Sequence, residues 1–187
     1  LAEAPGLLYV PNRPGAEVNY ANITFGQGMN ATMVQAVSAF CSVVNGGQYF
    51  RPTVVAGTVD ANGGLKPTAA SLLRRTISEQ SSATMRGMLS TARAVLNQRM
   101  PDKDKHGYDV GGKTGTSETL INGSYTMDET VATYIGYGGA NRPEYVIMVR
   151  VAAPGKRKNL QGNIHAAPIF TDISNWMIDY MKLAPKG

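Results

Sequence analysis

Three segments of the chain carry apolar residues at the three- and four-residue spacing of an amphipathic helix. The first begins after Thr32, a residue type that caps helices, and ends at Asn45-Gly46-Gly47, because glycine adopts a left-handed conformation at low cost. The second covers about residues 79–97 after the cap Ser78, and the third begins near Pro168, a residue suited to the first helical position. The third helix has the widest apolar face, formed by Ile169, Phe170, Ile173, Trp176, Met177, Tyr180 and Met181. We therefore expect it to pack on a large surface.

Three other segments have the composition of β-strands, at residues 108–117, 131–137 and 145–152. The last two are joined by residues 138–144, a glycine-rich, hairpin-like connection. A sheet made of these strands is the surface on which the C-terminal helix can pack. We therefore predict an α+β fold, in which an antiparallel sheet of at least three strands is flanked by helices. The C-terminal helix is expected on one face and the helix of residues 32–45 near the other.

The remaining segments predict irregular structure. Residues 1–28 are rich in proline, glycine and asparagine and are expected to form a loop. Residues 49–59 are expected to be an irregular strand region interrupted by Pro52, followed by a turn at residues 60–67. Pro101 prevents the second helix from continuing, so residues 101–105 are expected to be a charged loop.

The composition favours a packed domain over a disordered chain. The chain has 187 residues, of which 43% are hydrophobic and 17% charged, and this length fits one domain or a large part of one. It contains no run of about 18 apolar residues, so no membrane span is predicted, and no signal peptide is visible. Because the first residue is Leu1 and not methionine, we expect a processed or truncated piece. The single cysteine, Cys41, excludes an internal disulfide framework and a multi-cysteine zinc site.

The charge pattern gives no support to nucleic-acid binding. The net charge of +5 allows an acidic partner, but the charged residues are scattered along the chain. The densest cluster, Lys156-Arg157-Lys158, has no interleaved aromatic residues, so we interpret it as a solvated loop. No nucleic-acid partner is expected.

Residues 107–114 match the phosphate-binding pattern G-x-x-x-x-G-K-[ST] letter for letter. Such a loop needs a buried strand before it and a helix after it, so that backbone N–H groups surround the phosphate. Residues 101–106 are too polar for a buried strand, and Asn122-Gly123 follows Thr114 within eight residues, which leaves little room for a helix. The context of this motif therefore favours a different interpretation.

The second interpretation places Lys113-Thr114-Gly115-Thr116 on an edge strand that faces a cleft. Such a strand presents a cation, hydroxyls and unpaired backbone groups along one line, where an extended peptide can dock as an added strand. Alternation places the lysine on one face and the following threonine on the other, unless the strand twists at the glycines. Gly111, Gly112 and Gly115 remove side chains where a ligand must approach the backbone. The Lys-Thr-Gly triplet is a signature of serine β-lactamases and penicillin-binding proteins.

Five stretches in order make the chain resemble the C-terminal half of a class B penicillin-binding protein transpeptidase domain, the monofunctional type that crosslinks the cell wall. They are Phe25-Gly26-Gln27-Gly28; Val44-Asn45-Gly46-Gly47 with Arg51-Pro52; Gly112-Lys113-Thr114-Gly115-Thr116; Tyr134-Ile135-Gly136-Tyr137; and Ala166-Ala167-Pro168-Ile169-Phe170. The set covers nearly the whole chain and is more specific than any one member. The chain departs from the family pattern at Thr32-Met33, where relatives usually have Thr-Pro, and at Ser117, where many have alanine.

The resemblance implies a reaction and roles for the site residues. An active serine attacks the carbonyl of a D-Ala-D-Ala stem peptide, D-alanine leaves, and an amine of a neighbouring stem resolves the acyl-enzyme, with no cofactor and no metal. β-Lactam antibiotics resemble the dipeptide and trap the serine. Lys113 would supply positive potential and hydrogen-bond an S-x-N serine, and Thr114 and Thr116 would bind the carboxylate. The Thr116 backbone N–H would be an oxyanion-hole donor. Lys113 and Thr116 are thus the expected catalytic residues, and Lys113, Thr114, Gly115 and Thr116 the expected substrate-binding residues.

The nucleophile of such an enzyme is missing from the sequence. There is no S-x-x-K, and its nearest match, Ser71-Leu72-Leu73-Arg74, has arginine where a deprotonatable lysine is required. There is no S-x-N, and we interpret Tyr20-Ala21-Asn22, which mimics the Y-x-N variant, as loop. Residues 1–187 are therefore expected to be the C-terminal part of one transpeptidase domain, inactive alone, whose absent half carries the nucleophile.

The resemblance also implies partners and a location. The expected partners are the D-Ala-D-Ala stem peptide, β-lactam antibiotics, the absent half of the domain and wall-synthesis membrane proteins. The expected location is the extracytoplasmic face of the bacterial cytoplasmic membrane, with an anchor outside this chain, in cell division or cell shape. Two alternatives stay open: a non-catalytic β-lactam sensor or scaffold, and a β-lactamase or D,D-carboxypeptidase.

The other reactive side chains have structural interpretations. Cys41 lies on the apolar face of a predicted helix and is expected to be buried. His106 and His165 have no accompanying carboxylate or cysteine cluster, so a metal site is not expected. Asp102 and Asp104 are expected to be ordinary surface charges. Residues 125–129, between two expected strands, are placed at the border of the cleft.

Overall fold

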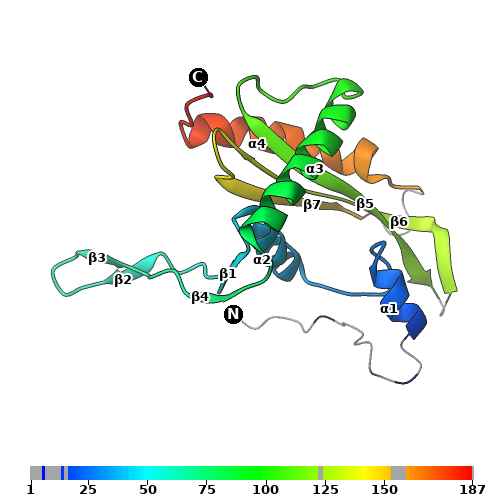
Figure 1. Ribbon diagram of the computed structural model, residues 1–187, viewed down its shortest axis with the longest axis horizontal. Coiled ribbons are helices and arrows are strands. Elements are labelled where there is room, and N and C mark those ends of the chain that lie inside the picture. Colours follow the sequence, from blue (N-terminus) through cyan, green and yellow to red (C-terminus); the bar gives the residue numbers. More distant parts are fainter. Residues whose placement is uncertain (1–5, 7–13, 15–16, 122–123, 153–158, 187) are drawn as a thin grey trace.

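Within the described residues, the main sheet contains three antiparallel strands in the order β5 (Asp109–Ile121), β6 (Ser124–Gly139) and β7 (Tyr145–Val151). The computed structural model describes residues 6, 14, 17–121, 124–152 and 159–186. The other elements are α1 (Glu17–Ile23), α2 (Met33–Val44), β1 (Gln48–Phe50), β2 (Gly57–Val59), β3 (Leu65–Pro67), β4 (Leu72–Arg75), α3 (Glu79–Gln98), the π-helix η1 (Gly162–Ala166) and α4 (Ala167–Tyr180). The predicted α+β fold, an antiparallel sheet flanked by helices, is confirmed (Figure 1).

The helices α2 and α3 begin at the caps that the sequence predicts. The Thr32 Oγ1 atom accepts a hydrogen bond of 3.1 Å from the Gln35 N–H, and the Gln35 side chain accepts one of 2.9 Å from the Thr32 N–H. The Ser78 Oγ atom accepts a hydrogen bond of 3.0 Å from the Ser81 N–H. Such caps satisfy otherwise unpaired backbone donors and stabilise a helix by about 1 kcal/mol each.

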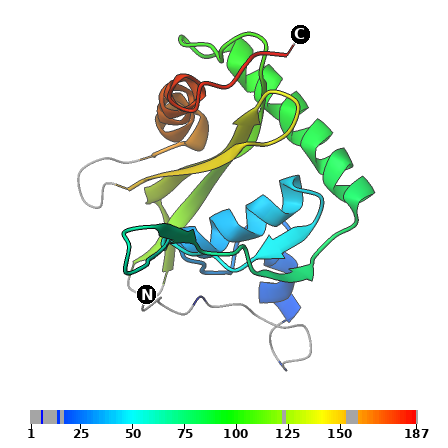
Figure 2. The ribbon, with the colours of Figure 1, turned by 90° about the vertical axis from the view of Figure 1, so that its left-hand side faces the viewer.

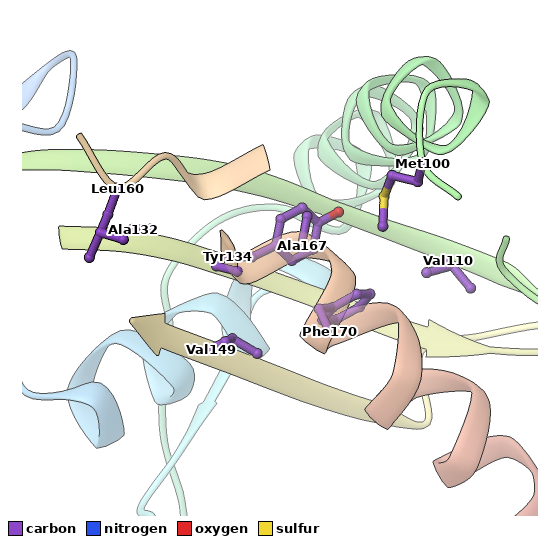
Figure 3. Packing of buried hydrophobic residues seen from close by; sticks show 9 residues of the cluster. Met100, Val110, Ala132, Tyr134, Val149, Leu160, Ala167 and Phe170 are labelled. Atoms are coloured by element: carbon purple, nitrogen blue, oxygen red, sulfur yellow. The ribbon is translucent and has the colours of Figure 1, made fainter. Parts of the chain in front are cut away.

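The two faces of the main sheet pack against different helices, as predicted (Figure 2). Tyr134 of β6 faces α4, where its ring centroid lies 4.6 Å from that of Phe170 (Figure 3). Tyr137 lies three residues later, and side chains at odd separations along a strand point to opposite faces. It packs with Val44 of α2 and Leu89 of α3. The sheet is therefore the middle layer of the fold.

Helix α3 packs against β5 and contributes to the core on both sides of the sheet. Leu89 belongs to the α2-side cluster, whereas Leu96 packs against the α4-side cluster. Arg93, which lies between Leu89 and Leu96 on α3, is only 1% exposed. It forms a bidentate ion pair with Asp104, in which Nε donates to Oδ2 at 2.8 Å and Nη2 to Oδ1 at 2.5 Å. The Arg93 Nη2 atom also donates to the Thr171 Oγ1 atom of α4 at 2.7 Å. The expectation that Asp104 is an ordinary surface charge is therefore wrong, because a buried guanidinium requires a paired carboxylate.

Two small two-stranded sheets lie outside the main sheet in the described part of the chain. Strands β1 and β4 pair antiparallel, and so do β2 and β3. The β2–β3 hairpin projects from the body of the molecule (Figure 1). The pairing of β1 with β4 was not predicted, because the four residues of β4 are all exposed and show no alternation.

Other differences from the sequence-based expectations concern element boundaries. Helix α1 lies within residues 1–28, which were expected to be loop, and it contains Tyr20-Ala21-Asn22. Strands β5 and β6 extend beyond their predicted ends and pair as far as Ile121 and Ser124, with a register shift at residues 118–119. Residues 125–129 consequently belong to strand β6 and do not connect two strands. The predicted loop Lys156-Arg157-Lys158 lies outside the described residues.

Candidate substrate-binding site

The residues Lys113, Thr114, Gly115 and Thr116 occupy consecutive positions of β5, opposite residues 132–135 of β6. Their register with β6 is regular from Asp109 to Glu118. Within the described part of the chain, β5 is an edge strand of the main sheet, so its other side has no strand partner there. The predicted edge-strand geometry of this segment is thereby confirmed.

This arrangement contradicts the phosphate-binding interpretation of residues 107–114. A P-loop needs a loop at its second glycine and a helix after its threonine. Here Gly112 and Thr114 lie inside one strand that continues to Ile121. The backbone N–H groups are therefore arranged along a strand and do not surround a phosphate.

The Lys113 ammonium lies beside the Thr114 hydroxyl although alternation points the two side chains to opposite faces. The Lys113 Nζ atom donates to the Thr114 carbonyl oxygen at 3.0 Å and to the Thr114 Oγ1 atom at 3.3 Å. The long lysine side chain thus reaches around the exposed strand edge. A cation and a hydroxyl donor lie next to each other there, which is an arrangement that suits a carboxylate.

Thr114 and Thr116 lie on the same face of β5, because they are two residues apart. The Thr116 Oγ1 atom accepts a hydrogen bond of 3.3 Å from the Gly162 N–H at the start of η1. The side chain of Thr116 is exposed, and that of Thr114 is half-buried. The Lys113 ammonium and the hydroxyls of Thr114 and Thr116 therefore lie along the edge of β5 within four residues.

The glycines of this strand also make room for side chains of the neighbouring strand. A Cβ atom at Gly111 would lie 2.5 Å from the Tyr137 ring, and one at Gly112 would lie 2.6 Å from the Tyr134 hydroxyl. A Cβ atom at Gly115 would overlap with the Thr133 Oγ1 atom. Each glycine therefore makes room for a side chain of β6. The tyrosines of the neighbouring strand need these positions to stay empty, whatever ligand binds.

A pocket of about 600 Å³ lies between α3, η1 and β5, with Lys113 and Thr114 in its lining. Its walls are mainly apolar, and Arg99 adds a second cation. The other lining residues are Ala92, Val95, Leu96, Met100, Pro101, Gly112, Tyr134, Asn163, Ile164 and Pro168. This combination of apolar walls and two cations suits an anionic ligand with an apolar body.

Tyr134 forms part of this pocket, but its hydroxyl is buried and has no hydrogen-bond partner among the described residues. Burial raises the pKa of Tyr134 to about 12, and the charge of Arg93 offsets part of this effect. The Arg93 guanidinium carbon lies 5.2 Å from the centroid of the Tyr134 ring. The sequence predicted neither the Arg93–Tyr134 contact nor the hydrogen bond from Gly162 to Thr116, since each joins residues far apart in the chain.

Replacing Tyr134 by phenylalanine should protect the chain against alkaline unfolding. The ordinary tyrosine pKa is near 10, so the unfolded chain ionises first and stability falls between about pH 10 and pH 12. We expect Tyr134→Phe to be about 2 kcal/mol more stable than the wild-type chain near pH 12, relative to their difference at pH 7. Urea unfolding of both proteins over this range measures the effect. Equal slopes with pH for the two proteins would contradict it.

The other reactive side chains do not form a second site. Among the described residues, no group of three or more His, Cys, Asp or Glu side chains is placed to hold a metal ion. His165 accepts a 2.9 Å hydrogen bond from the Gln161 N–H through Nδ1, so it closes a turn, whereas His106 is exposed. Cys41 is half-buried, and burial raises the pKa of its thiol, which disfavours the reactive thiolate.

Comparisons with known proteins identify relatives of this chain. A family model for the penicillin binding protein transpeptidase domain matches residues 3–175. The chain is 30% identical over 186 residues to Stage V sporulation protein D of Bacillus subtilis, covering 98% of this chain and 28% of that protein. It is 27% identical over 168 residues to the probable peptidoglycan D,D-transpeptidase PenA of Neisseria gonorrhoeae, covering 90% of this chain and 27% of that protein.

A solved structure with the same fold is penicillin binding protein 3 from Mycobacterium tuberculosis in complex with aztreonam. Its TM-score is 0.78 at 27% identity, over 99% of this chain and 42% of that one. This chain therefore corresponds to less than half of its structural neighbour and to less than a third of the two curated relatives.

Proposed function

Because the chain belongs to the penicillin binding protein transpeptidase domain family, we propose that it is part of a peptidoglycan D,D-transpeptidase. In this proposal it contributes the strand that holds the carboxylate end of the stem peptide. The observation that carries the proposal is the position of the Lys113 ammonium next to the Thr114 hydroxyl on the edge of β5. A D-Ala-D-Ala peptide ends in a carboxylate and can lie along such an edge as an added strand.

The geometry of β5 supports the roles that we propose for its residues. Lys113 and Thr114 bind the terminal carboxylate, and Thr116 adds a second hydroxyl on the face that it shares with Thr114. Gly115 contributes only its backbone between them, and its missing side chain makes room for Thr133 of β6. The backbone N–H of Thr116 is assigned to the oxyanion hole, where one donor lowers the barrier by about 3 kcal/mol.

The reaction in this proposal is a two-step acyl transfer. A serine oxygen attacks the penultimate D-alanine carbonyl, and the C–N bond breaks as the leaving D-alanine amine takes up a proton. An amine of a second stem peptide then attacks the acyl-serine ester, forms the new amide and returns the proton to the serine oxygen. β-Lactams enter the first step, and their ring-opened product remains on the serine. Penicillin binding protein 3 of the structural comparison binds aztreonam, which supports β-lactams as ligands here too.

We further propose that the attacking serine lies outside these 187 residues. The sequence contains no S-x-x-K. Ser71, in its nearest match, is exposed and precedes β4, which pairs with β1 in a separate sheet and not with β5. The short share of the relatives that this chain covers supports a nucleophile-bearing half elsewhere in a longer polypeptide, referred to below as the full-length protein.

The exposed apolar surface supports the same division of the domain. Helix α4 exposes an apolar stripe at helical spacing, formed by Ile169, Ile173, Trp176 and Tyr180, of which Tyr180 is 69% exposed. The rings of Trp176 and Tyr180 stack with centroids 4.7 Å apart. Large exposed apolar stripes are unusual on complete domains. We propose that the nucleophile-bearing half covers this face.

The proposed location is the outer face of the bacterial cytoplasmic membrane, through an anchor elsewhere in the full-length protein. Within the described residues, no helix has the length and apolar character needed to cross a membrane. Wall-synthesis membrane proteins are the proposed partners, in division or cell shape. Sporulation appears in the name of one relative and peptidoglycan D,D-transpeptidase in that of the other.

Product analysis of the full-length protein tests this function. Incubated with a diacylated Lys-D-Ala-D-Ala peptide and an acceptor amine such as glycine or a D-amino acid, it should release D-alanine and form the new amide. Release of D-alanine without amide formation would identify a D,D-carboxypeptidase, and rapid hydrolysis of benzylpenicillin would identify a β-lactamase. Stable β-lactam binding without any peptide turnover would identify a sensor or scaffold. Each of these three results would contradict the proposal.

A further inference from the structure

Gly162, the first residue of the π-helix η1, donates a backbone hydrogen bond to strand β5, which carries the candidate site. The Gly162 N–H donates to the Thr116 Oγ1 atom across 3.3 Å, and Gly162 is buried. The two residues are 46 positions apart in the sequence. This contact therefore joins the segment before α4 directly to a side chain that the proposed function assigns to the carboxylate of the ligand.

Gly162 fits at this place only because it has no side chain. A Cβ atom there would lie 2.6 Å from the Gly115 carbonyl oxygen, 2.6 Å from the Thr133 carbonyl oxygen and 3.0 Å from the Gly115 nitrogen. All three are backbone atoms of the paired strands β5 and β6. Any larger residue would push η1 away from the sheet or displace Gly115, which lies between the two site threonines.

Further contacts keep the donor in place. The Leu160 carbonyl oxygen accepts a hydrogen bond of 2.8 Å from the Thr130 Oγ1 atom, and the Leu160 side chain is buried beside Ala132 (Figure 3). The Gln161 carbonyl oxygen accepts from the His165 N–H at 2.9 Å. Ala166 is fully buried where η1 leads into α4. Short π-helical turns occur frequently at functional sites.

We propose that Gly162 is a positioning residue that orients the Thr116 hydroxyl toward the ligand carboxylate. A hydroxyl has one proton to donate and two lone pairs. The Gly162 N–H occupies one lone pair, so the proton of Thr116 is free to point away from η1 toward the strand edge. Accepting this hydrogen bond also makes the hydroxyl a better donor. The inference rests on the proposed function, because it takes the ligand of Thr116 to be a carboxylate.

Acylation of the full-length protein by benzylpenicillin and by its uncharged methyl ester separates positioning from packing. The quantity compared is the ratio of the two acylation rate constants. We expect Gly162→Ala to lower this ratio about ten-fold, which corresponds to one hydrogen bond to a charged group. We expect no further loss when Gly162→Ala is added to Thr116→Val, because the hydroxyl is then already absent. Gly87→Ala in α3 is the matched control, since a Cβ atom there meets nothing within 4 Å, and the ratio should not change.

A Gly162→Ala protein that retains the wild-type ratio would overturn the inference, as would an equal loss in the Thr116→Val background. A second measurement does not need Gly162→Ala to fold. In this chain, amide exchange of Gly162 by NMR should be slow in the wild type and in Thr116→Ser, and faster in Thr116→Val. Equal exchange in all three would overturn the inference. A wild-type full-length protein that no β-lactam acylates would instead refute the proposed function, while the exchange experiment still tests the hydrogen bond.

Discussion

Replacing Lys113 by methionine should lower the rate of acylation of the full-length protein by benzylpenicillin about 10- to 100-fold. The Lys113 ammonium lies 3.3 Å from the Thr114 hydroxyl at the edge of β5. A hydrogen bond to a charged group contributes about 1.5 to 3 kcal/mol, and here it is lost together with its charge. Methionine keeps most of the length and the apolar stem of the side chain. Rapid-quench kinetics or a fluorescent penicillin measures the change.

The matched control for this prediction is Lys66→Met. Lys66 is an exposed lysine on β3, in a small hairpin that does not pair with the main sheet, and its replacement removes the same net charge. We expect its acylation rate to stay within about two-fold of the wild type, because exposed charges distant from a site act weakly. Lys113→Arg should recover part of the rate. Equal rates for Lys113→Met and Lys66→Met would contradict a role for the ammonium in carboxylate binding.

Replacing Asp104 by alanine should reduce the free energy of unfolding of the chain by about 3 to 5 kcal/mol. Asp104 forms the bidentate ion pair with Arg93, whose side chain is only 1% exposed. Without the carboxylate, the guanidinium stays buried, and the Thr171 hydroxyl is the oxygen partner that the described residues leave to it. Arg93 also lies against the rings of Tyr134 in β6 and Phe170 in α4, so the change weakens the packing of β6 on α4. Urea unfolding followed by circular dichroism measures the loss.

Asp102→Ala is the matched control, since Asp102 is exposed in the same loop, and we expect a change within about 0.5 kcal/mol. The double variant Arg93→Met with Asp104→Ala should recover most of the stability, because a buried ion pair can be replaced by apolar residues with little loss. A double variant as unstable as Asp104→Ala alone would contradict the assignment of the loss to the unpaired charge.

Local signals in the sequence were sufficient for the main helices and for the sheet. The caps Thr32 and Ser78 fix the starts of α2 and α3 through contacts within three residues. The strands were recognised by their apolar segments, but the extension of the β5–β6 hairpin past Ser117 was missed. The residues there are mostly polar and pair because the neighbouring strand continues beside them. Helix α1 was missed for a similar reason, since none of its residues is buried and it has no apolar stripe.

The sequence predicted where the candidate site lies on the strand but not the long-range contacts that hold this strand in place. The motif and its context place residues 113–116 on an edge strand, and the structure agrees. Three supporting features were not predicted, because each joins distant parts of the chain. They are the Arg93–Asp104 ion pair, the tyrosines that pack against Gly111 and Gly112, and the hydrogen bond from the Gly162 N–H to Thr116. The sequence alone does not show whether a glycine leaves room for a ligand or for a neighbouring side chain. Here side chains of β6 occupy the space beside these glycines.

Mapping the penicillin adduct tests the central claim most directly. The full-length protein is incubated with benzylpenicillin, digested and analysed by mass spectrometry, and this chain alone is treated in the same way. We predict one adduct of penicillin mass on a serine outside residues 1–187 of the full-length protein, and none on the isolated chain. An adduct on any residue within 1–187, or no adduct on either protein, would contradict the claim that this chain supplies the carboxylate-binding strand and another segment supplies the nucleophile.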